Sequence, residues 1–69
     1  MELAIDTATD TASVAVSRRG VPVAEISWRA GQNHTVNLMP NTLHLFKLIG
    51  EEFSKIDAVF VSLGPGSYN

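Results

Sequence analysis

The hydrophobic period of the chain changes twice, and this constrains the fold more than any other feature. Residues 2–6 (ELAID) and 12–17 (ASVAVS) are short apolar runs typical of strands, and residues 21–28 (VPVAEISW) alternate between two faces. From residue 34 onward, apolar residues recur every three or four positions, which is the period of an amphipathic helix. Residues 58–63 (AVFVSL) form a continuous apolar run apart from Ser62. The predicted order is therefore strand, strand, strand, helix, strand.

The second and third strands are predicted to form a tight antiparallel hairpin. Only Arg19 and Gly20 separate them, which is the length of the commonest hairpin turn. Pro22 has no backbone N–H for a central ladder, so the third strand is expected at an edge of the sheet.

The predicted helix covers roughly residues 34–49 and carries an apolar stripe. The stripe consists of Val36, Met39, Leu43, Phe46, Ile49 and Phe53. Pro40 is tolerated if the helix begins near Met39 and kinks it if the helix begins near His34. Gly50 is a suitable helix end.

A second apolar set, Leu38, Leu45 and Leu48, lies beside this stripe. Two explanations remain open. These leucines either broaden the contact with the core or leave apolar surface for a partner.

The last apolar run, bounded by Asp57 and Gly64, is typical of a strand buried on both faces. A right-handed crossover through the helix should return it parallel to the first strand. The carboxyl ends of parallel strands share one edge of a sheet, where ligands bind in open α/β folds. Residues 6–11 (DTATDT) and 64–67 (GPGS) are therefore expected to line one mouth.

Groups suited to phosphate or nucleotide occur in both of these loops. They are Asp6, Thr7 and Thr9 in the first loop and Gly64, Gly66 and Ser67 in the second. Carboxylates and hydroxyls can orient a metal-bound phosphate, and glycine N–H groups suit an anion. Considered separately, each loop is explained better as a simple turn.

Metal binding by histidines is not expected. Two helical ligands need a spacing of three or four residues, but Leu38 stands four residues after His34, and His44 is ten residues away.

Charge and composition exclude several further classes. Five Lys and Arg stand against seven Asp and Glu, and no basic cluster exceeds Arg18-Arg19, so direct binding of nucleic acid by this chain is not expected. No cysteine is present to form a disulfide scaffold. No signal peptide or membrane-spanning run is visible, so a soluble cytoplasmic protein is expected.

Three segments together, LAIDTATDTASVAV, NHTVNLMPNTLHLF and IDAVFVSLGPGSYN, closely resemble the TsaB (YeaZ) family of tRNA threonylcarbamoyladenosine biosynthesis proteins. The resemblance is colinear and covers essentially the whole chain. Family members continue with an aromatic residue, Thr-Gly-Leu-Arg and a second half. Tyr68 supplies the aromatic residue, and Asn69 stands where the family more often has Thr. Residues 1–69 are therefore expected to be a partial amino-terminal domain, truncated before the next helix.

The resemblance implies the actin-like ATPase (ribonuclease H-like) α/β fold, whose first domain begins with three antiparallel strands, a helix and a parallel strand. It also implies a noncatalytic subunit that activates TsaD, the related subunit that transfers threonylcarbamoyl to the tRNA adenosine beside the anticodon. TsaD carries paired metal-binding histidines on its corresponding helix, but this chain has Leu38 at the second position.

The expected partners are a TsaD-type catalytic subunit and a TsaE-type ATPase, with a homodimer through the helix as an alternative. Contact with tRNA would be indirect, no membrane is involved, no cofactor is required, and a nucleotide could bind at the partner interface of the full-length protein. The expected interface consists of Val36, Leu38, Met39, Leu45 and Leu48. Substituting both Leu38 and Leu45 by Asp in the full-length protein is then expected to abolish association with TsaD while leaving the monomer folded.

An enzyme of the same fold is the alternative function. An ATP-dependent phosphotransferase or ATPase would use Asp6 to orient a metal and the GPGS loop to hold phosphate. Against this alternative, Ala8 stands where ATP-hydrolysing relatives usually have glycine, and no lysine is near.

Overall fold

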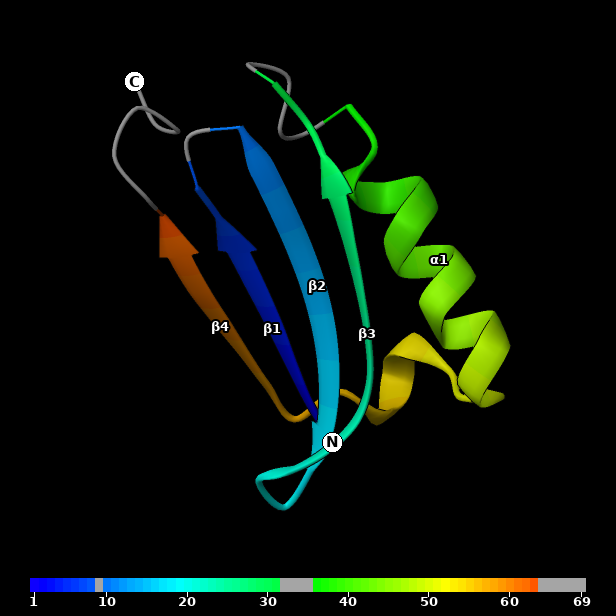
Figure 1. Cartoon of the computed structure of the whole chain (residues 1–69). Coiled ribbons are helices and arrows are strands. Elements are labelled where there is room, and N and C mark those ends of the chain that lie inside the picture. Colours follow the sequence, from blue (N-terminus) through cyan, green and yellow to red (C-terminus); the bar gives the residue numbers. More distant parts are fainter. Residues whose placement is uncertain (9, 32–35, 64–69) are drawn as a thin grey trace.

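The computed structural model of the 69-residue chain describes residues 1–8, 10–31 and 36–63. Within these ranges four strands form one mixed sheet, and one α-helix lies on one of its faces (Figure 1). The elements follow the predicted order: β1 (Glu2–Thr7), β2 (Thr11–Arg18), β3 (Val21–Arg29), α1 (Leu38–Ile49), the 3-10 helix η1 (Phe53–Lys55) and β4 (Ala58–Leu63).

The spatial order of the strands is β3-β2-β1-β4. β1 runs antiparallel to β2 and parallel to β4, and β2 runs antiparallel to β3. The predicted parallel pairing of the last strand with the first is confirmed. The predicted edge position of the strand that contains Pro22 is also confirmed, since β3 lies at one end of the order.

The turn between β2 and β3 has the backbone conformation of a two-residue hairpin. Both of its residues have positive φ, 53° at Arg19 and 80° at Gly20, which matches the right-handed twist of the strands. The Glu2 carboxylate accepts hydrogen bonds from the N–H groups of Gly20 (3.0 Å) and Arg19 (3.3 Å) and from the Ser17 hydroxyl (2.8 Å). These bonds, led by that from Gly20, lower the pKa of Glu2 and hold the turn against β1.

α1 begins at Leu38, so Pro40 lies in the first helical turn. The N–H groups of this turn have no intrahelical partner, and the missing N–H of proline therefore costs no helical hydrogen bond. Of the two starts considered, the one near Met39 is confirmed, because Val36 and Asn37 precede the helix in a turn. The remaining residues of the longer alternative, including His34, lie outside the described ranges.

α1 ends as Gly50 predicts. Gly50 adopts φ 71°, and its N–H donates to the Lys47 carbonyl (3.3 Å). The N–H of Glu51 donates to the Phe46 carbonyl (3.1 Å). This pair of bonds is the Schellman arrangement, which satisfies two of the carbonyls left open at a helix end.

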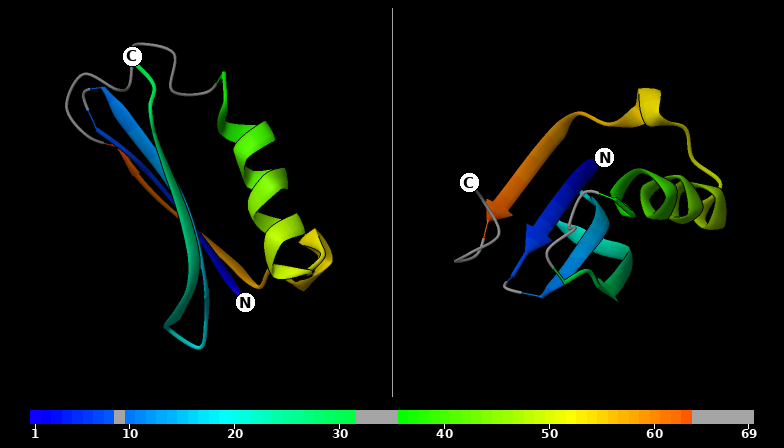
Figure 2. Two further views of the ribbon diagram at one scale, coloured as in Figure 1. Left: turned by 45° about the vertical axis from the view of Figure 1, so that its right-hand side comes forward. Right: turned by 90° about the horizontal axis from the view of Figure 1, so that it is seen from above.

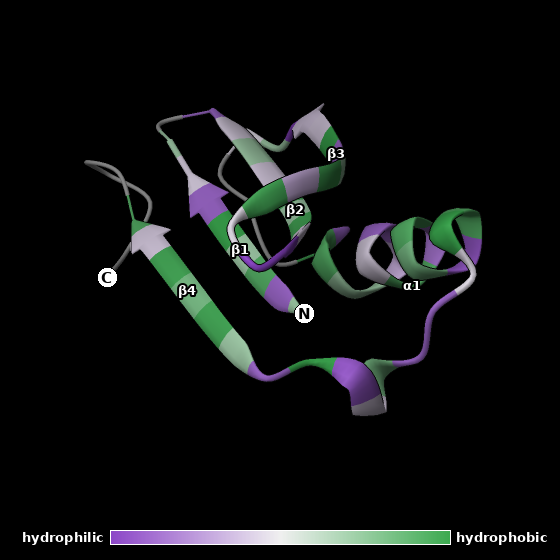
Figure 3. Ribbon diagram, turned by 90° about the horizontal axis from the view of Figure 1, so that it is seen from below, coloured by the Kyte–Doolittle hydropathy of each residue, from purple (hydrophilic) through white to green (hydrophobic). Residues whose placement is uncertain are grey.

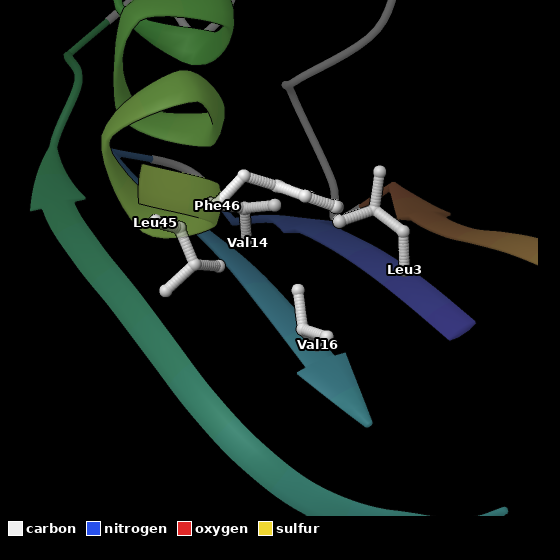
Figure 4. Close-up of a cluster of buried hydrophobic side chains, with 5 residues drawn as sticks. All are labelled: Leu3, Val14, Val16, Leu45 and Phe46. Carbon is white, nitrogen blue, oxygen red and sulfur yellow. The ribbon is translucent and has the colours of Figure 1, made fainter. Parts of the chain in front are cut away.

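The core lies between α1 and the sheet. Figure 4 shows its buried cluster: Leu3, Val14, Val16, Leu45 and Phe46. α1 packs mainly on β2 and β3, and Phe46 extends toward Leu3 of β1 (Figure 4). Ala24, Ile26 and Trp28 of β3 pack against this cluster. Fully burying an aliphatic or aromatic side chain contributes about 1.5–3 kcal/mol, so these contacts are the main stabilisation of the chain.

The predicted inward face of the helix is partly wrong. Phe46 is buried and Ile49 is half-buried, but Met39 and Leu43 are 58% and 51% exposed. The residue that replaces them in the core is Leu45, which is 1% exposed. Apolar residues cover much more than one face of this helix, so its sequence pattern did not determine which sector meets the sheet.

The prediction that the last strand is buried on both faces is wrong for the described chain. Val59, Phe60, Val61 and Leu63 are all between 50% and 61% exposed. α1 lies over the other half of the sheet, and β4 is an edge strand that pairs only with β1 in the described ranges (Figure 2). A continuous apolar sequence indicates that burial is favourable, but it does not supply the covering layer.

Candidate functional site

The exposed apolar residues of α1 do not form one surface. Successive residues of an α-helix are rotated by about 100°, so Met39 and Leu43 lie about 40° apart on one flank. Leu48, which is 66% exposed, lies about 140° from Leu43, on the opposite flank. We call Met39 and Leu43 the Leu43 flank. Phe46 lies between this flank and the core, and its side chain extends toward Leu3 of β1 (Figure 4).

The five residues of the predicted partner interface therefore differ in their exposure to solvent. Val36, Met39 and Leu48 are exposed, Leu38 is half-buried, and Leu45 is in the core. Leu45 cannot contact a partner without leaving the core, so this part of the prediction is wrong. The expected outcome of the Leu38 and Leu45 double substitution is corrected with it, because a carboxylate at residue 45 would be buried without a charge partner and would unfold the chain.

A shallow cavity of about 370 Å³ adjoins the Leu43 flank. The residues that line it are Leu43, Phe46, Lys47, Glu51, Glu52 and Phe53. Phe46 and Phe53 pack edge to face with ring centroids 4.6 Å apart, and this contact ties η1 to α1. Phe53 remains 41% exposed, so the apolar surface extends from the helix onto η1.

The carboxyl ends of β1 and β4 meet as predicted. In the parallel register Asp6 stands beside Ser62, and Thr7 stands beside Leu63. Asp6 is exposed, whereas Thr7 is 7% exposed and its hydroxyl has no hydrogen-bond partner in the described part of the chain. The other residues predicted for this mouth, Thr9, Gly64, Gly66 and Ser67, lie outside the described residues.

The first loop also closes the hairpin between β1 and β2. The N–H of Ala8 donates to the Thr11 carbonyl (2.8 Å). The Asp10 carbonyl accepts bonds from the N–H groups of Ala30 (2.9 Å) and Gly31 (3.1 Å), which joins this loop to the end of β3. A structural role for the loop is therefore shown, as the simpler of its two explanations predicted.

A polar cleft at the opposite end of the sheet was not predicted. It encloses about 600 Å³ around the amino-terminal amine, which pairs with the carboxylates of Asp57 and, at 3.6 Å, Glu2. The hydrogen bond to Asp57 is the main cause of the raised pKa of this amine. Arg18 pairs with Glu51 in the same cleft. The partners are 56 and 33 residues apart in the chain, so no local sequence pattern could reveal them.

Neither a metal centre nor a membrane segment is found in the described residues. No group of three His, Cys, Asp or Glu side chains there could hold a metal ion, and His44 is exposed on α1. No helix in residues 1–8, 10–31 and 36–63 is long and apolar enough to cross a bilayer. Comparison of the chain with protein-family models, with curated proteins and with solved structures found no match.

Proposed function

We propose that this chain is a noncatalytic subunit of the cytoplasmic complex that attaches threonylcarbamoyl to the tRNA adenosine beside the anticodon. Its role is to bind a TsaD-type catalytic subunit, which works with a TsaE-type ATPase, and to keep that subunit in a state that can transfer threonylcarbamoyl. The three segments that resemble the TsaB family support this assignment. The element order and the sheet order β3-β2-β1-β4 agree with the first domain of the actin-like ATPase fold, which we propose for the chain.

The observation that carries the partner role is the exposure of the Leu43 flank. Met39 and Leu43 are more than half exposed, and the apolar surface continues onto Phe53. Apolar side chains spaced four residues apart on a helix are suited to pack against a second helix. A protein partner fits this surface better than tRNA, because the only cation among the residues that line the adjoining cavity is Lys47, beside Glu51 and Glu52.

The test is reconstitution of tRNA threonylcarbamoylation from TsaD, TsaC and TsaE components, with and without the full-length version of this chain. The expected result is modification that depends on the chain, which by itself neither hydrolyses ATP nor modifies tRNA. Leu43→Asp should abolish co-elution with the TsaD-type subunit and reduce modification at least tenfold. Leu48→Asp, with a similar exposure on the opposite flank, should leave both within twofold.

Modification that proceeds equally well without the chain would refute the proposal. Equal effects of Leu43→Asp and Leu48→Asp would reject the Leu43 flank as the contact surface. Circular dichroism of both variants shows whether the substitutions leave the fold intact.

An ATP-dependent phosphotransferase or ATPase is the second candidate. The observation in its favour is the meeting of the β1 and β4 carboxyl ends beside exposed Asp6. The buried Thr7 hydroxyl next to it has no hydrogen-bond partner among residues 1–8, 10–31 and 36–63. Calorimetric titration with ATP and magnesium distinguishes the candidates. Tight binding with turnover that Asp6→Asn removes would favour the enzyme.

A further inference from the structure

We draw no further inference here: the strongest candidate, the exposed apolar surface of β4 (Ala58–Leu63) at the open edge of the sheet (Figure 3), supports none, because nothing in residues 1–8, 10–31 and 36–63 shows what covers it.

Discussion

The contrast between Leu45 and Leu48 is the strictest test of how α1 packs. The two leucines lie in the same helix, 1% and 66% exposed respectively. Truncating a buried leucine to alanine costs about 2–5 kcal/mol, because both the transfer energy and the packing of its neighbours are lost. Exposed substitutions usually change stability by less than about 0.5 kcal/mol. Since a chain of this length has a total stability of roughly 3–10 kcal/mol, Leu45→Ala should remove a large part of it.

Urea unfolding, followed by circular dichroism and by the fluorescence of Trp28, measures both variants at one protein concentration. Both variants replace leucine by alanine in the same helix, so the change in helix propensity is the same in each. The difference between their free energies of unfolding therefore reports the difference in burial. Leu45→Ala is expected to lower the free energy of unfolding by at least 2 kcal/mol more than Leu48→Ala. Losses that agree within about 0.5 kcal/mol would refute the assigned orientation of α1.

Three further predictions concern the turns. Gly50→Ala should lower the free energy of unfolding, measured in urea, by about 1 kcal/mol, because alanine is strained in the left-handed conformation. An added Cβ would meet nothing within 4 Å, so no steric clash contributes to this loss. An unchanged free energy would contradict the assigned helix end. Arg19→Asn should raise the free energy of unfolding by about 0.5 kcal/mol, because asparagine tolerates the positive φ of this position better than arginine does. A decrease of more than about 1 kcal/mol would argue against the assigned hairpin turn. Glu2 has a lowered pKa, so its stabilisation is complete above its ordinary pKa of 4.5 and is lost as the pH falls through the lower folded value. The stability difference between the unmodified chain and Glu2→Gln should accordingly be constant near neutral pH and shrink below pH 4.5; a difference independent of pH would contradict the bonds from Gly20 and Ser17.

Local sequence determined the order of the elements, the hairpin turn and the end of α1, whereas it left the start of α1 open between His34 and Met39. Short apolar runs marked β1, β2 and β4, and alternation marked β3. Arg19-Gly20 marked the hairpin turn, and Gly50 marked the end of α1. Each of these features depends on residues only a few positions apart, whose backbone preferences act without the rest of the chain. Once the order of the elements was known, only a few positions in the sheet remained possible for β4. The rule that parallel crossovers are right-handed then predicted its pairing with β1.

Only the tertiary structure decided which apolar residues are covered. Leu45 and Leu48 are identical side chains three residues apart, yet one is in the core and the other is exposed, because the angle at which α1 meets the sheet selects the buried sector. β4 is exposed although its sequence is typical of a buried strand, because α1 lies over β2 and β3. Burial depends on what packs against a residue, and that is a property of segments distant in the chain.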